Sequence, residues 1–283
     1  MRVLITGATG YLGTAMLEQV PAGIDVIATG FTRGHVPLDV TDALAVRNAI
    51  HQHRPDAVVH LAAVSMTGAA AADPERATAV NVAGARAVAD ATGGCDIRLV
   101  ALSSDVIFDG EHAPYDEEAL PRPVNPYGES KLAGERAIAD AHPDPLIVRT
   151  SVLVGRNRAD RYPFTMFVLQ QARNGLPVKL FENERRNFYP VTSAAAAIWE
   201  CAGATVTGIL NIGATDSTSR FQFGKDLLIA AGLDPALAIP AAGPPERPSD
   251  LTLIVDRARE ALATPMPTRD EVMVELRRDL HLT

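Results

Sequence analysis

The stretch TGATGYLG, residues 6–13, decides the fold predicted for this chain. It follows RVLI, an apolar run rich in β-branched residues, and it opens YLGTAMLEQV, where apolar residues recur at helical spacing. Glycines between a strand and a helix permit a tight turn and let backbone amides approach a pyrophosphate. The stretch therefore predicts the first strand, turn and helix of a dinucleotide-binding domain.

The residues that follow repeat the alternation of strand and helix. Strands are predicted at 25–30, 56–62, 97–104 and 145–151, and helices at 40–53, 73–92 and 125–141. Apolar strands that alternate with helices are typical of a parallel sheet covered on both faces. We therefore expect an α/β fold, with a Rossmann-type doubly wound sheet in residues 1–155.

The alternation weakens from residue 156 onward. Helices are predicted at 161–175, 192–203 and 268–282, and a strand at 208–213. We expect residues 156–283 to form a smaller, irregular substrate-binding region, interleaved with the first domain. It should pack over the carboxyl ends of the strands, where open parallel sheets bind ligands.

Charge and composition exclude several classes of function. The formal net charge of -8 over 283 residues argues against a nucleic acid partner, which requires clustered Lys and Arg. Cys95 and Cys201 have no metal-binding spacing, so no metal site is expected. The apolar runs are too short for a membrane span, and MRVLITGATG reaches glycine too early for a signal peptide. We expect a cytoplasmic protein that does not bind membranes.

Seven ordered motifs point to one family. They are TGATGYLG, LDVTD at 38–42, VVHLAA at 58–63, NVAG at 81–84, LSSDVIFDG at 102–110, YGESKLAGE at 127–135 and VRTSVLVG at 148–155. Residues 2–155 in this way resemble the extended branch of the short-chain dehydrogenase/reductase family, which acts largely on nucleotide-linked sugars. The glycine spacing differs from the standard GxGxxG pattern.

The resemblance implies a catalytic set of Ser104, Tyr127 and Lys131. The tyrosine would exchange a proton with the substrate oxygen, the lysine would lower the pKa of the tyrosine and hold the nicotinamide ribose, and the serine would polarise the oxygen. Tyr127 and Lys131 lie four residues apart, which places them on one face of a helix. A phenol with an ordinary pKa of about 10 needs such a cation to act near neutral pH. Ser103 is the alternative to Ser104.

The resemblance also implies which residues bind the cofactor. Asp39 and Val40 would flank the adenine, and residues 61–63 would run along the cofactor. Asn81 would support a proton relay, with a helix-stabilising backbone contact as the alternative. The implied set is Gly7, Thr9, Gly10, Tyr11, Leu12, Gly13, Asp39, Val40, Leu61, Ala62, Ala63, Asn81, Tyr127 and Lys131.

NADP is favoured over NAD by the residues that follow the second predicted strand. ATGFTRG, residues 28–34, has no carboxylate to bond the ribose hydroxyls, and Arg33 lies at about the distance where an arginine pairs with a 2′-phosphate. The alternative is that Arg33 points into solvent. NAD remains the second candidate.

The substrate class follows from a narrower resemblance. Residues 102–110, 114–135 and 247–262 look like the dTDP-4-dehydrorhamnose reductase group, whose members reduce a keto sugar with NAD(P)H. Dehydratases of the family usually carry Asp-Glu after the catalytic residue, whereas Asp105 and Val106 follow Ser104 here. The implied substrate-binding residues are Ser104, Asp105, Val106 and Arg247. Arg185 and Arg186 are further candidates for a diphosphate.

The sequence departs from the related reductases at two places, and two alternative functions stay open. Residues 150–155 read TSVLVG where related reductases have TSWLYG, and the acidic residue usual after the proline of residues 184–198 is absent. The alternatives are a non-catalytic, cofactor-binding subunit resembling the regulatory subunit of methionine adenosyltransferase, and an epimerase. We expect a nucleotide sugar as the ligand and a homodimer as the assembly.

Overall fold

A parallel sheet of seven strands runs through the computed structural model, which describes residues 1–31, 36–158, 163–244 and 247–282. The strand order is β11-β6-β5-β4-β1-β2-β3, and it changes direction between β1 and β4. Ligands of doubly wound sheets bind beside the carboxyl ends of the strands at such a switch point. The strands are β1 (Arg2–Thr6), β2 (Asp25–Gly30), β3 (Val36–Pro37), β4 (Ala57–His60), β5 (Arg98–Ser104), β6 (Leu146–Thr150) and β11 (Gly208–Ile212).

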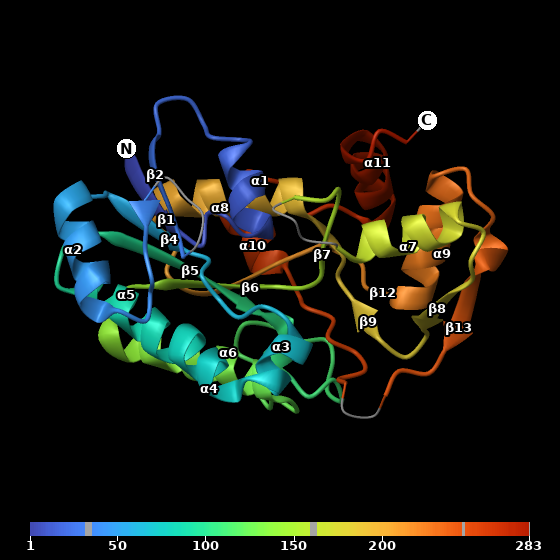
Figure 1. The fold of residues 1–283 in the computed structure, drawn as a ribbon, viewed down its shortest axis with the longest axis horizontal. Coiled ribbons are helices and arrows are strands. Elements are labelled where there is room, and N and C mark those ends of the chain that lie inside the picture. The colour runs from blue at the N-terminus through green and yellow to red at the C-terminus, as the bar shows by residue number, and fades with distance from the viewer. Residues whose placement is uncertain (32–35, 159–162, 245–246, 283) are drawn as a thin grey trace.

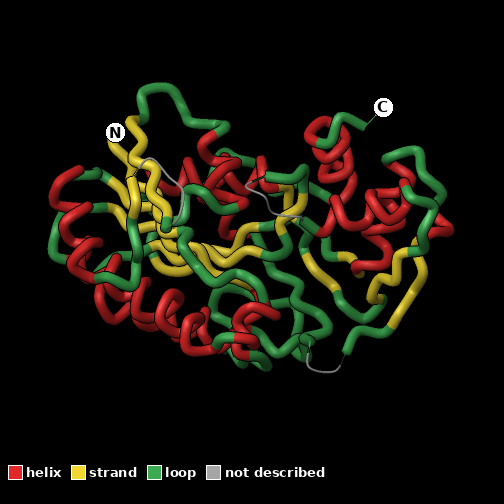
Figure 2. The backbone as a smooth tube through the Cα atoms, in the orientation of Figure 1, coloured by secondary structure: helices red, strands yellow, loops and turns green. Residues whose placement is uncertain are grey.

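Helices cover both faces of the sheet (Figure 1). Along β1, Val3 and Ile5 enter one apolar core and Leu4 enters the other, as the alternation of side chains on a strand requires. Figure 2 shows the strands between the two helical layers. The first layer holds α1 (Tyr11–Leu17), α8 (Val191–Gly203) and α10 (Asp256–Ala261); the second holds α2 (Ala43–His53), α5 (Ala85–Gly93) and α6 (Pro126–Ala141). None of the helices in the described ranges has the length and apolar character that a membrane crossing requires.

The helix predicted at 73–92 is interrupted. It consists of α4 (Pro74–Thr78), a π-helical segment η1 (Ala79–Gly84) and then α5, and it is preceded by a short helix, α3 (Thr67–Ala72). Gly84 faces Val40 so closely that a Cβ at position 84 would meet the valine side chain at 2.8 Å. π-Helical turns inside α-helices are frequent at functional sites. This one packs against α6 and, through Asn81, contacts the loop that follows β4.

Part of the chain from Val154 onward forms a second, smaller region with its own core (Figure 1). Helices α7 (Phe164–Arg173), α9 (Arg220–Ala230) and α11 (Arg269–Asp279) pack there with the paired strands β8 (Val178–Phe181) and β13 (Ala238–Ala241). The chain also returns to the large sheet through α8, β11 and α10, so the two regions are interleaved in sequence. The remaining elements are β7 (Leu153–Val154), β9 (Arg185–Arg186), β10 (Tyr189–Pro190), β12 (Thr218–Ser219) and the 3-10 turns η2 (Asp105–Ile107) and η3 (Pro235–Leu237).

Candidate active site

Two glycines let α6 pack closely against the turn η2, which follows β5, and against the π-helical segment η1. The helix begins at Pro126, and the Asn125 side chain caps it by accepting a hydrogen bond from the amide of Gly128 at 3.0 Å. A Cβ at position 128 would lie less than 3.0 Å from the Val106 carbonyl oxygen. A Cβ at Gly134 would meet the carbonyl oxygen of the π-helical segment at Asn81 equally closely. The motif YGESKLAGE therefore sets how near the helix comes to the sheet as well as which side chains it carries.

Lys131 is anchored at the end of β5. Its Nζ donates a hydrogen bond of 2.7 Å to the carbonyl oxygen of Leu102. Burial lowers the pKa of Lys131 to about 8, and the charge of Glu135 acts in the opposite direction. Glu135 itself forms a buried ion pair of 2.8 Å with Arg149 of β6. Glu135 was missed at the sequence level, although its position one turn after Lys131 was a usable signal.

Tyr127 is a protonated phenol in this environment. Burial raises the pKa of Tyr127 to about 12; the Ser104 side chain acts to lower this pKa and the charge of Asp105 acts to raise it. The lowered tyrosine pKa that the family resemblance implied is therefore not seen in the protein alone. The reason is that burial dominates, while the Lys131 ammonium is held by the Leu102 carbonyl.

The two candidate serines point to different faces of β5. Ser104 is half-buried, and its Oγ donates to Asp105 Oδ1 at 3.2 Å and accepts from the Val106 amide at 3.5 Å. Ser103 is buried and lines a small cavity together with Lys131. Only Ser104 acts on the Tyr127 phenol, so the geometry favours the predicted Ser104 over Ser103.

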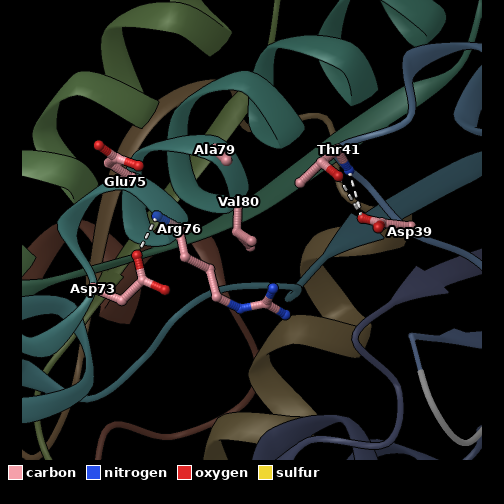
Figure 3. A pocket seen from close by; sticks show the side chains of 7 residues that line it. All are labelled: Asp39, Thr41, Asp73, Glu75, Arg76, Ala79 and Val80. Atoms are coloured by element: carbon pink, nitrogen blue, oxygen red, sulfur yellow. Dashed lines mark hydrogen bonds between the residues drawn. The ribbon is translucent and has the colours of Figure 1, made fainter.

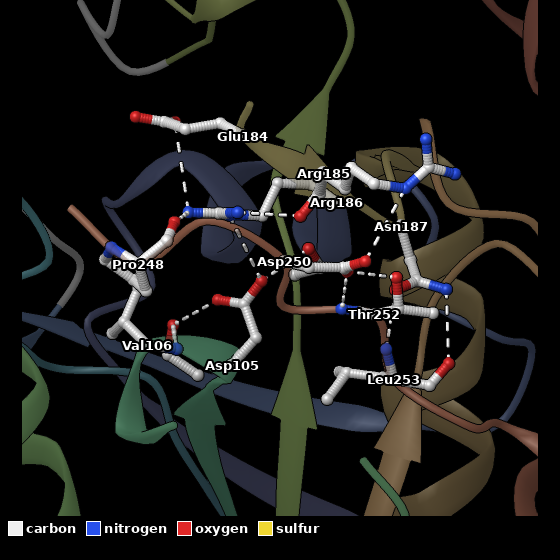
Figure 4. Close-up of polar contacts among 12 residues, drawn as sticks. Asp105, Val106, Glu184, Arg185, Arg186, Asn187, Pro248, Asp250, Thr252 and Leu253 are labelled. Atoms are coloured by element: carbon white, nitrogen blue, oxygen red, sulfur yellow. Dashed lines mark hydrogen bonds and ion pairs between the residues drawn. The ribbon is translucent and has the colours of Figure 1, made fainter. Parts of the chain in front are cut away.

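Asp105 is buried, and Figure 4 shows its carboxylate next to the guanidinium of Arg186. Its carboxylate accepts a hydrogen bond of 2.6 Å from Ser151 and lies 3.9 Å from the guanidinium of Arg186. Burial raises the pKa of Asp105, and Arg186 and the two serines act against that shift. Protein groups therefore already engage this carboxylate, so Asp105 holds Ser151 and Arg186 close to Ser104, and the predicted substrate contact of Asp105 is not supported. Its neighbour Val106 is half-buried.

The glycine turn lies directly against the loop that follows β4. Gly7 has a positive φ of 68°, and a Cβ there would meet the backbone nitrogen of Ala62 at 2.7 Å. The Ala62 amide donates to Thr6 Oγ1 at 3.3 Å, and Thr6 Oγ1 is hydrogen-bonded to His60 Nδ1 at 2.7 Å. These contacts bring the predicted cofactor-binding segments 7–13 and 61–63 together.

The start of α1 presents backbone rather than side chains. Gly10 is the N-cap, and no side chain caps the helix. The Leu12 side chain is buried in the core, so only its backbone amide could contact a ligand. Thr9 and Tyr11 are half-buried. A Cβ at Gly13 would lie 2.6 Å from the carbonyl oxygen of Ala8. The turn fits the pyrophosphate of a dinucleotide, because compact backbone and free amides are what such a group requires.

Asn81 braces the site from the π-helical segment. Its Oδ1 accepts from the Val64 amide at 2.8 Å, and its Nδ2 donates to Ser130 Oγ at 2.9 Å. The Asn81 side chain thus connects the π-helical segment to the loop after β4 and to α6. Asp39 accepts two hydrogen bonds from Thr41, through the amide at 2.9 Å and the hydroxyl at 2.8 Å. Arg33 lies outside the described residues.

An arginine cluster faces the sheet from the second region. Glu184 is fully buried and accepts hydrogen bonds from Arg220 at 2.6 Å and from Arg247 at 3.0 Å. Burial acts to raise the pKa of Glu184, but its arginine partners lower this pKa below the ordinary value. Arg247 is part-exposed and also lies over the ring of Phe181. The organising role of Glu184 was not foreseen from the sequence.

Arg186 differs from what the sequence suggested. It is buried and donates to the carbonyl oxygens of Pro248 and Ser249, both at 2.8 Å (Figure 4). Its guanidinium is therefore neither a solvated surface group nor free to hold a diphosphate. Arg185 is exposed and donates to the Ser217 carbonyl oxygen at 2.9 Å.

The family model of the RmlD substrate binding domain matches residues 1–279. The chain belongs to this family. The predicted family and the predicted doubly wound α/β fold are thereby confirmed.

Individual relatives extend the comparison. The dTDP-4-keto-6-deoxy-D-glucose reductase of Streptomyces niveus is 33% identical over 94% of this chain and 92% of its own length. The crystal structure of dTDP-4-dehydrorhamnose reductase from Bacillus anthracis in complex with NADP has a TM-score of 0.87 and 27% identity, covering 97% of this chain and 96% of that one. Methionine adenosyltransferase 2 subunit beta of Xenopus tropicalis is 35% identical, but over only 54% of this chain and 47% of its own length.

Proposed function

We propose that this chain is an NADPH-dependent reductase that transfers hydride to the keto group of a nucleotide-linked 4-keto sugar. The observation that carries the proposal is the position of Tyr127 and Ser104. The two side chains interact where β5 ends and α6 begins, beside the turn and the loop that fit a dinucleotide. A hydride donor and a proton donor would therefore meet at one carbonyl group.

The side chains divide the chemistry between them. When bound, NADPH supplies the hydride that attacks the carbonyl carbon. The Tyr127 phenol keeps its proton at neutral pH and gives it to the carbonyl oxygen, so that the ketone becomes an alcohol. The Ser104 hydroxyl orients that oxygen. We assign Lys131, whose Nζ donates to the Leu102 carbonyl oxygen in the protein without cofactor, to the cofactor ribose and to the phenolate that remains, as the family resemblance implies.

NADP is the proposed cofactor, with NAD as the second candidate. The glycine turn, the loop at 61–63 and the absence of a capping side chain at α1 fit the pyrophosphate and the backbone of either dinucleotide. The choice of NADP is supported by the relative from Bacillus anthracis, whose structure contains NADP. It is also supported by Arg33 in the sequence.

The second region is proposed to bind the nucleotide part of the substrate. Arg220 and Arg247 converge on Glu184, and Arg186 connects this cluster to Asp105, the neighbour of Ser104. Arg247 is the most exposed of these three guanidinium groups, so we assign it to the diphosphate. This is the substrate-binding role proposed for residues 156–283.

Two alternative functions are less well supported. A non-catalytic subunit would not need Ser104, Tyr127 and Lys131 together, and the methionine adenosyltransferase subunits match only about half of this chain. An epimerase is disfavoured because the Streptomyces niveus relative, which matches this chain over 92% of its own length, is named as a reductase. A cytoplasmic location and a homodimer remain proposals, which cell fractionation and light scattering would test.

Turnover measurements separate the three functions. A reductase consumes NADPH in proportion to the keto sugar nucleotide supplied. A regulatory subunit binds NADPH without turnover of any nucleotide-linked keto sugar, and an epimerase converts the sugar without net NADPH oxidation. Either of the last two results would overturn the proposed function.

A further inference from the structure

A cation from a distant helix reaches the end of β2. Phe31 directly follows β2, and it is at this strand end that dinucleotide-binding folds place the adenosine ribose. The guanidinium carbon of Arg76, on α4, lies over the Phe31 ring, 5.6 Å from its centroid. The fold therefore supplies an arginine where a cofactor carries either a 2′-hydroxyl or a 2′-phosphate.

Arg76 projects into a cleft of about 370 Å³ (Figure 3). Asp39, which the family resemblance assigns to the adenine, lines the same cleft, as do Ala79 and Val80. In Figure 3 the Arg76 guanidinium points away from Asp73 and Glu75. The cleft thus shares Asp39 with the adenosine end of the proposed cofactor site.

The carboxylates around the cleft are largely engaged elsewhere. Asp39 accepts hydrogen bonds from Thr41, and Asp73 caps α4 by accepting from the backbone amide of Arg76 at 2.9 Å. Within the described ranges, no carboxylate forms an ion pair with the Arg76 side chain. Its N–H donors are therefore left for a ligand.

We propose that Arg76 recognises the 2′-phosphate of NADPH and that α4 thereby sets the preference for NADPH over NADH. This inference rests on the proposed function as a cofactor-dependent reductase. A guanidinium matches a phosphate through two parallel hydrogen bonds. Phe31 covers one face of the guanidinium and holds it in place, which leaves its donor edge for the phosphate oxygens.

The nearby acids make the arginine necessary. Asp39, Asp73 and Glu75 line the cleft, and their negative charge would repel a 2′-phosphate that lacked a cation beside it. An NADPH preference therefore depends on Arg76 more strongly than it would in a neutral cleft.

Binding of two small nucleotides tests the inference without turnover. 2′,5′-ADP and 5′-AMP differ only in the 2′-phosphate, so calorimetric titration of both isolates that group. We expect Arg76→Ala to raise the Kd for 2′,5′-ADP by roughly 10- to 100-fold and to leave the Kd for 5′-AMP within about twofold of the wild-type value. The affinity of Arg76→Lys for 2′,5′-ADP should lie between those of Arg76→Ala and the wild type. Lysine keeps the positive charge but lacks the planar guanidinium that forms two parallel hydrogen bonds. Arg86→Ala removes an exposed arginine that pairs with Asp90 and should change neither affinity.

Three results would overturn the inference. Equal weakening of both nucleotides by Arg76→Ala would show a contact with the adenine instead. Unchanged discrimination in Arg76→Ala, together with its loss in Arg33→Ala, would place the 2′-phosphate on the segment after β2. Equal affinity of the wild type for both nucleotides would show that the protein does not recognise the 2′-phosphate. Since neither nucleotide carries a nicotinamide, these outcomes are independent of whether the protein reduces a keto sugar.

Discussion

Gly128 packs against Val106 in the turn η2 that follows β5: a Cβ at position 128 would lie less than 3.0 Å from the Val106 carbonyl oxygen. Because Gly128 directly follows Tyr127, this contact fixes the phenol relative to Ser104 two residues before Val106. The distance between Tyr127 and Ser104 therefore depends on the lack of a side chain at Gly128.

We expect Gly128→Ala to lower kcat by about 10- to 100-fold, because the methyl group forces α6 away from the end of β5 and misplaces Tyr127. It should also cost about 1–3 kcal/mol of stability through overpacking. Gly203→Ala is the control, since a Cβ at that position has no neighbour within 4 Å. Equal kcat values for the two variants would contradict this account of the helix position.

The buried Glu135–Arg149 pair should control the charge of Lys131. The pKa of Lys131 is about 8, so activity that needs the ammonium should fall as the pH rises through this value. Glu135→Gln removes a negative charge that favours the ammonium, and we expect the alkaline limb of kcat/KM for NADPH to move to lower pH.

The same variant leaves Arg149 without its carboxylate and should destabilise the protein by about 3–5 kcal/mol. Asp140→Asn, at an exposed position of α6, is the matched control. A pH profile of Glu135→Gln that overlies that of the control would show that Glu135 has no electrostatic influence on Lys131.

His60 should make the fold sensitive to acid. Burial, together with the charge of Lys131, lowers the pKa of His60 from 6.5 to about 3. Between these values the unfolded chain binds a proton that the folded protein excludes. Stability is therefore lost as the pH falls, by about 1.4 kcal/mol per pH unit from this group. We expect urea unfolding of His60→Gln to show a shallower loss of stability from pH 6.5 downward; a parallel loss in both proteins would assign the effect to other groups.

Arg247 should contribute to substrate affinity rather than to the chemical step. Its removal leaves Glu184 paired with Arg220, so the fold should persist. We expect Arg247→Ala to raise KM for the nucleotide sugar by roughly tenfold with little change in kcat. Arg47→Ala, at an exposed position of α2, is the control. A fall in kcat without a change in KM would argue against a diphosphate at Arg247.

The sequence predicted those parts of the fold that depend on local pattern. Apolar periodicity located the helices and strands of the sheet. Asp42 caps α2 by accepting hydrogen bonds from the amides of Leu44 and Ala45. The π-helical segment was not predicted, and the close contact of Gly84, at its end, is with Val40, which is distant in sequence.

The site was predictable to the same extent. The positions of Ser104, Tyr127 and Lys131 follow from motifs. The roles of Glu184, Arg186 and Arg76 depend instead on partners that only the tertiary structure supplies. Arg186 illustrates the limit most clearly, since an arginine beside a loop is usually exposed, and here it is buried among carbonyl oxygens.

Tyr127→Phe tests the central claim most directly, because it removes the proton donor and keeps the ring. The measurement is the rate of NADPH oxidation with a nucleotide-linked 4-keto sugar that the wild type reduces, alongside the Kd for NADPH. We expect kcat to fall at least ~100-fold while the Kd for NADPH changes by less than about threefold. A kcat near the wild-type value in Tyr127→Phe would contradict the assignment of Tyr127 as the acid, and with it the proposed mechanism.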